Sequence, residues 1–139
     1  MGNFLGRYEI YIYAVLRMVS GFLFMWHGTQ KLFGFPPSGR PAGALDAFTA
    51  IGGGIELIGG LLIMIGLFTS IAAFLSSGMM AVAYFGWHFQ MEKFLPIQNQ
   101  GELAVLYCFV FLYIAARGSG VWSVESLFKG NRAAAADMA

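Results

Sequence analysis

The sequence predicts an all-α fold in which four transmembrane helices pack as one bundle, with both termini on the same side of the membrane. Two features of the composition indicate a chain that lies in lipid: 58% of its 139 residues are hydrophobic and only 11% are charged, whereas soluble domains contain about 25% charged residues. The third observation is that the apolar residues form four runs separated by turn and loop signals. A single domain, residues 1–139, is expected for this length.

The first transmembrane span is expected over about residues 10–33. Such a helix is long enough to cross a hydrocarbon core of roughly 30 Å at about 1.5 Å per residue. A loop should follow, because residues 34–43 are rich in glycine and proline. Asp46 is the expected N-cap of the second span, which we place over about residues 48–67.

The third span is expected over about residues 70–89, with Thr69 and Ser70 forming a tight turn and the N-cap. The fourth is expected over about residues 102–117, where the sequence Asn-Gln-Gly-Glu ending at Glu102 resembles a capping box. Its apolar part is only about 21 Å long. The fourth span therefore needs flanking residues or a locally thinner bilayer.

The remaining C-terminal residues are expected outside the spans. Residues 121–129 should lie at the membrane interface with Trp122 pointing inward, and residues 130–139 should form a tail. Four spans leave an excess of basic residues on the side of the termini, with Arg7, Arg17, Arg117, Lys129 and Arg132 there and Lys31, Arg40 and Lys93 on the other. By the positive-inside rule, the termini of this multi-pass protein should be cytoplasmic. The membrane is expected to be a bacterial-type plasma (inner) membrane.

Composition also excludes some functions. The net charge is +1 with no basic run, so nothing indicates nucleic-acid binding. Cys108 is the only cysteine, and one thiol cannot form an internal disulfide, a C-x-x-C relay or an iron–sulfur site. Thiol-based redox chemistry within one chain is therefore excluded.

Several polar residues interrupt the apolar spans. The first span contains Arg17, His27, Gln30 and Lys31, and Glu56 is the only charge of the second. A charge near the bilayer centre costs about 2.5–3.5 kcal/mol on insertion scales, so such groups usually face a bundle interior, a polar cavity or an interface. Arg17 and Lys31 could alternatively reach the two membrane surfaces by snorkelling.

Counting residues from the helix ends places most of these groups at similar depth, in the half of the bundle opposite the termini. We expect this distal site to include five ionisable residues and two tryptophans beside the histidines: His27, Lys31, Glu56, His88, Glu102, Trp26 and Trp87. Arg17 lies toward the other end but could reach Glu56. The cluster is thus either a ligand site or internal packing in which Arg17 satisfies Glu56, and Glu102 is either a site residue or a helix cap.

Glycines accompany these polar residues and predict close helix–helix contacts. In the first span Gly21 and Gly28 share a helix face with Arg17 and Lys31. Glu56 in the second span is bracketed by two glycine pairs, one of which is Gly59 and Gly60. These glycine-rich faces could pack within the bundle or against another protein.

The order of motifs resembles the DoxX family of small four-helix membrane proteins. Residues 17–34 read R-x3-G-x-L-F-x2-H-G-x2-K-L-F-G, and similar segments follow at residues 55–66, 101–102 and 118–125. The likeness covers roughly residues 14–128. It implies an association with quinone-linked oxidoreductases, redox-stress responses or membrane complexes. The quoted motifs carry the resemblance onto Arg17, His27, Lys31, Glu56 and Glu102.

Residue chemistry and resemblance together suggest a quinone, or a similar small hydrophobe, as the ligand of the distal site. Histidine and glutamate beside aromatic rings supply the donors and acceptors that a quinone ring needs. A b-type haem between His27 and His88 and a metal held by these histidines with Glu56 are the other chemistries considered. No covalently held cofactor is expected.

Two functions from different classes are the main candidates, ahead of a proton-coupled carrier of small molecules, which four helices without a visible inverted repeat make less favourable. The first is a membrane subunit of quinone-linked redox machinery, which would not be catalytic alone because its electrons would come from a partner chain. The alternative is a structural or accessory subunit that packs beside a larger membrane complex. The polar cluster would then stabilise helix packing within the bundle and bind no ligand.

Overall fold

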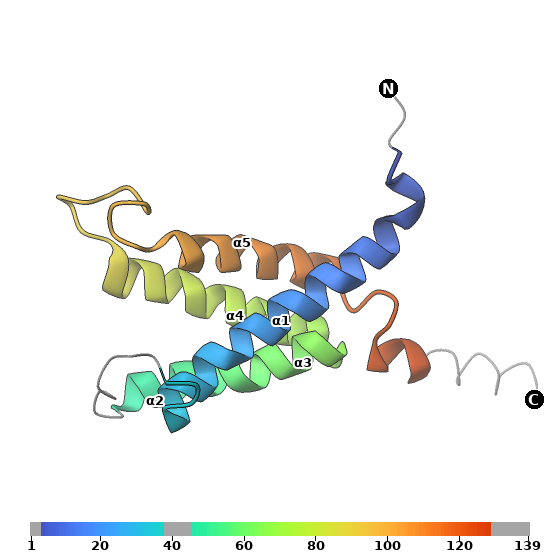
Figure 1. The fold of residues 1–139 in the computed structure, drawn as a ribbon, viewed down its shortest axis with the longest axis horizontal. Coiled ribbons are helices and arrows are strands. Elements are labelled where there is room, and N and C mark those ends of the chain that lie inside the picture. Colours follow the sequence, from blue (N-terminus) through green and yellow to red (C-terminus); the bar gives the residue numbers. More distant parts are fainter. Residues whose placement is uncertain (1–3, 38–45, 129–139) are drawn as a thin grey trace, which may run out of the picture.

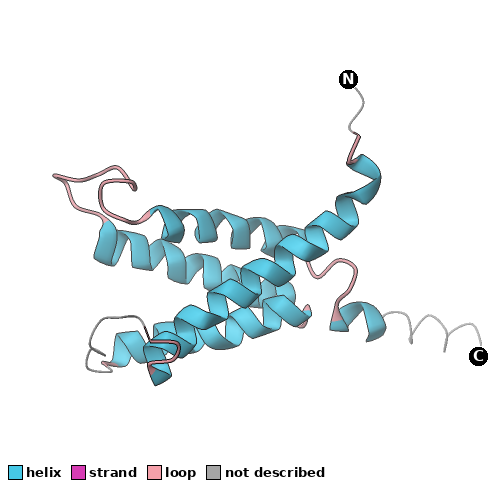
Figure 2. Cartoon of the chain, viewed as in Figure 1, coloured by secondary structure: helices cyan, strands magenta, loops and turns pink. Residues whose placement is uncertain are grey.

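The computed structural model describes residues 4–37 and 46–128, and these residues are helical apart from turns, loops and one isolated bridge. The prediction of an all-α fold is confirmed. The chain runs through four long helical stretches in succession (Figures 1 and 2): η1 (Gly6–Tyr8) with α1 (Glu9–Phe33); α2 (Ala47–Gly54), η2 (Ile55–Gly59) and α3 (Gly60–Ile65); α4 (Thr69–Ala83) with η3 (Tyr84–His88); and α5 (Glu102–Arg117).

Three of these stretches are long and apolar enough to cross a membrane by length and composition: Gly6–Phe33, Ala47–Ile65 and Thr69–His88. The fourth, α5, has 16 residues and is therefore about 24 Å long, as short as the sequence predicted. The expected and observed helix ends differ by one or two residues. Glycines set two of the ends, because Gly34 and Gly66 adopt the left-handed conformation that stops a helix.

Each of the second and third stretches contains one wide, π-type turn. These turns are η2, which contains Glu56, and η3, which ends at His88. Such turns are rare and occur often at functional sites. They were not expected from the sequence, and both contain a residue predicted for the distal site.

The four stretches pack as two pairs, α1 against the second stretch and α4 against α5 (Figure 1). The first pair is in backbone contact: a Cβ atom at Gly21 would lie 2.6 Å from the carbonyl oxygen of Gly60, and one at Gly28 would overlap the backbone of Leu57. Gly59 packs against the side chain of Ser76 on α4. The glycine-rich faces are thus largely used inside the bundle rather than left for another protein.

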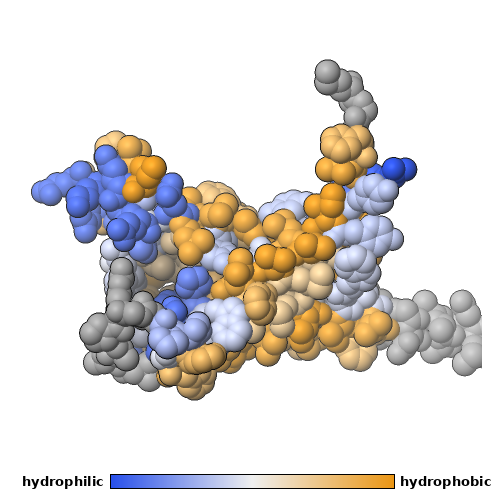
Figure 3. Space-filling model, viewed as in Figure 1, coloured by the Kyte–Doolittle hydropathy of each residue, from blue (hydrophilic) through white to orange (hydrophobic). Residues whose placement is uncertain are grey.

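The outer surface of the helices is strongly apolar, as a lipid-facing surface should be. Large side chains such as Ile51, Ile71 and Phe109 are each more than 60% exposed. Figure 3 shows this hydrophobic surface along the helices and a hydrophilic patch over the loop between η3 and α5. The bundle therefore has an apolar belt with polar residues at the distal end.

The fully buried Arg17 holds the C-terminal segment onto the bundle. Its Nη1 donates hydrogen bonds to the carbonyl oxygens of Ile63 (2.6 Å) and Met64 (2.9 Å), and its Nη2 donates to that of Trp122 (2.8 Å). These carbonyls lie at the C-terminal end of α3, where a cation is favourable; that of Ile63 also accepts from the Gly66 N–H (3.3 Å). The Trp122 ring itself is 57% exposed and packs on Tyr11, so the expectation that Trp122 points inward was wrong.

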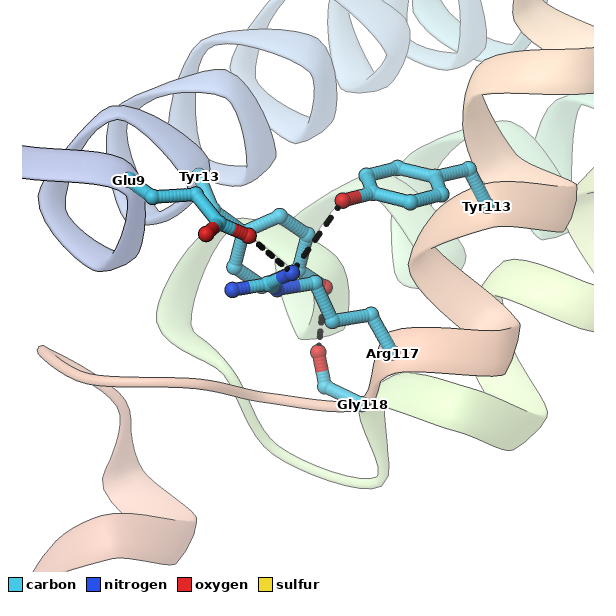
Figure 4. A network of polar contacts seen from close by, with 5 residues as sticks. All are labelled: Glu9, Tyr13, Tyr113, Arg117 and Gly118. Carbon is cyan, nitrogen blue, oxygen red and sulfur yellow. Dashed lines mark hydrogen bonds and ion pairs between the residues drawn. The ribbon is translucent and has the colours of Figure 1, made fainter. Parts of the chain in front are cut away.

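A second set of contacts joins the start of α1 to the end of α5 (Figure 4). Arg117 Nη1 donates to Glu9 Oε1 (2.7 Å) and to the Tyr113 hydroxyl (3.3 Å), and the Tyr13 hydroxyl donates to the carbonyl of Gly118. The Arg117 guanidinium also lies over the Tyr13 ring, 4.7 Å from its centre. The first turns of α1 and the last turn of α5 therefore lie together. The membrane side on which they lie stays a prediction, and the tail of residues 130–139 is outside the described residues.

The predicted helix caps are partly corrected. Asp46 caps α2 as expected, since its Oδ1 accepts from the Thr49 N–H (2.7 Å). Neither Thr69 nor Ser70 caps α4. Instead Glu125 Oε1, from the segment that Arg17 holds, accepts from the Thr69 N–H (3.0 Å). Glu102 closes no capping box, because it is the first residue of α5 rather than the third.

Candidate functional site

Lys31 and Glu56 form an ion pair at the distal end of the bundle. Lys31 Nζ lies 2.5 Å from Glu56 Oε1, and the two side chains are 39% and 3% exposed. The expectation that Arg17 could pair with Glu56 was wrong. Arg17 lies about 21 Å along α1 from Lys31 and donates to backbone carbonyls near the other end. The cation that lies level with η2 along the bundle, and pairs with Glu56, is Lys31.

The ion pair forms part of the wall of a pocket of about 210 Å³ between the helical stretches. The other lining residues come from α1, α4, η3, α5 and the loop before α5, and they combine polar side chains with an apolar and aromatic surface. They are Phe24, His27, Met80, Ala83, His88, Gln100, Leu103, Ala104 and Tyr107. The structure thus brings His27, Lys31, Glu56 and His88 to one pocket from three separate stretches.

The two histidines lie in different surroundings. The His27 ring meets the Tyr107 ring edge to face, with ring centres 6.2 Å apart. His88 Nδ1 lies 3.1 Å from the backbone carbonyl oxygen of Asn99. Because a carbonyl oxygen only accepts, this contact assigns the proton of neutral His88 to Nδ1 and leaves Nε2 as an acceptor.

The other four predicted residues lie outside this pocket. Glu102 lines a larger groove of about 860 Å³ along α5. Trp26 lines a hollow of about 340 Å³ between α1 and α5. Trp87 is 57% exposed and stacks on Phe48, with ring centres 4.1 Å apart. Arg17 lies at the opposite end, as described above.

Sequence reasoning missed Tyr107 and Gln100. Tyr107 carries no charge at neutral pH, but its spacing with the buried Phe111 and Ile114 places it on the inner face of α5. Together with its place near the start of α5, this pattern could have located it. Gln100 has a positive φ of 59°, which is uncommon for a residue other than glycine and is found often at functional sites. No sequence signal marks that conformation.

Metal binding has no evident site in the described part of the chain. Among residues 4–37 and 46–128, no three His, Cys, Asp or Glu side chains gather as a metal ion would need. The pocket instead offers a cation, a carboxylate, two imidazoles and a phenol beside aromatic and aliphatic side chains. Such a surface can bind a small ring that carries polar oxygens.

Fold and pocket together define a small, multi-pass helical membrane protein with a polar pocket between its helices. The DoxX family model matches residues 12–89, and the chain belongs to the DoxX family. A Haemophilus influenzae protein, described as an uncharacterized protein, is 41% identical over 130 residues, which cover 91% of this chain and 97% of that protein. No solved structure matches the chain.

Proposed function

We propose that this protein is an integral membrane subunit of quinone-linked redox machinery that binds the ring of a quinone, or of a similar small hydrophobe, in the distal pocket. The observation that carries the proposal is the pocket itself, where the Lys31–Glu56 ion pair and two histidines lie beside Phe24 and Tyr107. An ionisable group within a transmembrane bundle is a functional-site candidate by default. The ion pair and histidines would hold the ring oxygens, and electrons would come from a redox partner.

The size of the pocket favours a single ring. Pockets for drug-sized ligands measure about 300–1,000 Å³, whereas this one measures about 210 Å³. A ring of one six-membered cycle with small substituents suits such a volume, and any long tail would have to lie outside it.

Two hollows of the outer surface adjoin the pocket, which suits a ligand that arrives dissolved in lipid. The hollow between α1 and α5 shares His27, Leu103 and Tyr107 with the pocket. The groove along α5 shares Gln100 and Leu103 with it, and is lined on its far side by apolar residues such as Ile97 and Phe109. A ring could enter between α1 and α5 while its tail lies along the apolar groove.

A steric block tests the proposal without changing the charges. Ala83 lines the pocket, whereas the neighbouring Val82 is 50% exposed on the outer surface. In protein-containing nanodiscs, Ala83→Phe should lower the affinity for a short-tailed quinone at least tenfold, and the matched Val82→Phe should leave it unchanged. Equal binding by Ala83→Phe and the unaltered protein would contradict the proposed pocket.

The alternative of a structural or accessory subunit is an outcome of the same experiment. Its strongest support from sequence was the glycine-rich faces, but Gly21, Gly28 and Gly60 pack within the bundle. A protein that binds no quinone and is recovered only with a larger membrane complex would favour the accessory role.

A further inference from the structure

We propose that the distal pocket selects the reduced, hydroxyl-bearing form of its ring over the oxidised, carbonyl-bearing form. This inference rests on the proposed function, because it concerns which form of the same ligand the same pocket holds. It depends on the hydrogen-bonding groups that the pocket presents, and in particular on acceptors that the protein leaves for the ligand.

The first such acceptor is Glu56 Oε2. Glu56 is 2% exposed, and its Oε1 accepts from Lys31 Nζ. Its Oε2 is buried and has no hydrogen-bond partner among the described residues. As the carboxylate of an ion pair, Glu56 has only acceptor oxygens. A buried acceptor without a partner is unfavourable, so a ligand with an O–H group in this pocket would supply the missing donor.

The second acceptor is His88 Nε2. Since Nδ1 donates to the Asn99 carbonyl, the remaining ring nitrogen of neutral His88 can only accept. The His88 ring lines the same pocket as Glu56. Glu56 and His88 belong to η2 and η3, the two wide turns of the bundle, and both residues line the pocket.

The N–H donors of Lys31 are also compatible with a ligand hydroxyl group. One of its three N–H donors is used by Glu56, and no other acceptor for Lys31 is found among the described residues, so the others can serve an oxygen of the ligand. A hydroxyl group can donate to Glu56 Oε2 and accept from Lys31 at once. A carbonyl oxygen can accept from Lys31 but would then lie near Oε2, where two acceptors repel each other and the carboxylate oxygen stays unpaired.

Three probes built on the same tetramethyl ring separate these possibilities, and the first two have nearly the same shape. They are duroquinone, its reduced form duroquinol, and the dimethyl ether of duroquinol, which has no O–H donor. The fully methylated ring resists covalent addition by the Cys108 thiol or by lysines. Affinities are measured anaerobically by equilibrium dialysis of protein-containing nanodiscs, with protein-free nanodiscs of the same lipid as the baseline for partitioning.

We expect duroquinol to bind at least tenfold more tightly than either duroquinone or the dimethyl ether. If either duroquinone or the dimethyl ether binds as tightly as duroquinol, the selection is refuted while the proposed pocket stands. If none of the three binds above the protein-free baseline, the proposed function and this inference both fail.

A variant that removes the charge of Glu56 provides the second test. In Glu56→Gln, the side-chain oxygen can still accept from Lys31 while the amide NH2 takes the place of Oε2 and donates. The ratio of duroquinol to duroquinone affinity should therefore fall at least tenfold. The same change at the exposed loop residue Glu92, Glu92→Gln, should leave the ratio unaltered. An unchanged ratio in folded Glu56→Gln would overturn the assignment of Oε2 as the selecting acceptor.

Discussion

Replacing Arg17 by methionine should destabilise the bundle and release its C-terminal segment. Methionine keeps much of the length and apolar volume of arginine but donates no hydrogen bonds. Arg17 makes three hydrogen bonds of 2.6–2.9 Å to the carbonyls of Ile63, Met64 and Trp122. Hydrogen bonds between transmembrane segments contribute about 0.6–1.7 kcal/mol each, so the free energy of unfolding should fall by about 2–5 kcal/mol.

The assay is reversible unfolding of purified protein in mixed micelles, followed by circular dichroism. The control is Arg7→Met, because Arg7 is exposed in η1 and its loss should change the unfolding free energy by less than about 0.5 kcal/mol. In Arg17→Met, amide hydrogen exchange should also rise in residues 119–128 and at Thr69, whose N–H is capped by Glu125. A stability equal to that of the unaltered protein, with unchanged exchange in those residues, would refute the role given to Arg17.

Three further predictions concern packing, topology and pH. Gly28→Ala should destabilise the bundle by about 1–3 kcal/mol or more through its backbone overlap with the second stretch, whereas Gly54→Ala, which meets open space, should be neutral or slightly stabilising in the same unfolding assay. Reporter fusions after Gly130 and within residues 36–41 should lie on opposite sides of the membrane, cytoplasmic for the former, and the same side for both would refute four spans. Hydrogen bonds from the Thr49 backbone and side chain lower the pKa of Asp46. Its capping contribution is therefore complete above the ordinary carboxyl pKa of about 4 and is lost as the pH falls through the lowered pKa. The hydrogen-exchange protection factors at the start of α2, which correct for the intrinsic pH dependence of exchange, should fall with acid and should not follow that titration in Asp46→Asn.

The sequence was most informative where a single physical rule dominates. Long apolar runs and the glycines that end them place the helices within one or two residues, because a span in lipid must satisfy its own backbone. The Asp46 cap followed from local chemistry alone. The caps of α4 and α5 did not, since Glu125 reaches Thr69 from a distant part of the chain and Glu102 begins its helix.

The depth of the candidate site along the bundle could be predicted from the sequence, but the direction in which each side chain points could not. Counting residues brought His27, Lys31, Glu56 and His88 to the same end, and all four line one pocket. It could not show that Trp87 faces outward, because a helix residue at the right depth can point to any side. Counting residues also left Arg17 as the considered partner of Glu56, although Lys31 lies nearer to it and forms the ion pair.

Two other features depend on tertiary packing. The backbone contact between Gly28 and Leu57 brings Lys31 of α1 near η2, and no local pattern reveals such a contact. The wide turn that contains Glu56 likewise has no recognised sequence signal. The partner of Glu56 could therefore be identified only from the structure.

Photolabelling tests most directly whether the distal pocket binds a quinone ring. A short-tailed azidoquinone is bound to the protein in nanodiscs, irradiated, and located by mass spectrometry of the labelled peptides, with excess unlabelled quinone as competitor. Competed labelling is expected at pocket-lining residues such as His27, Lys31 and Tyr107, and that labelling should be lost in Ala83→Phe. Labelling confined to the lipid-facing surface, for example around Ile71, and insensitive to competitor would contradict this binding site.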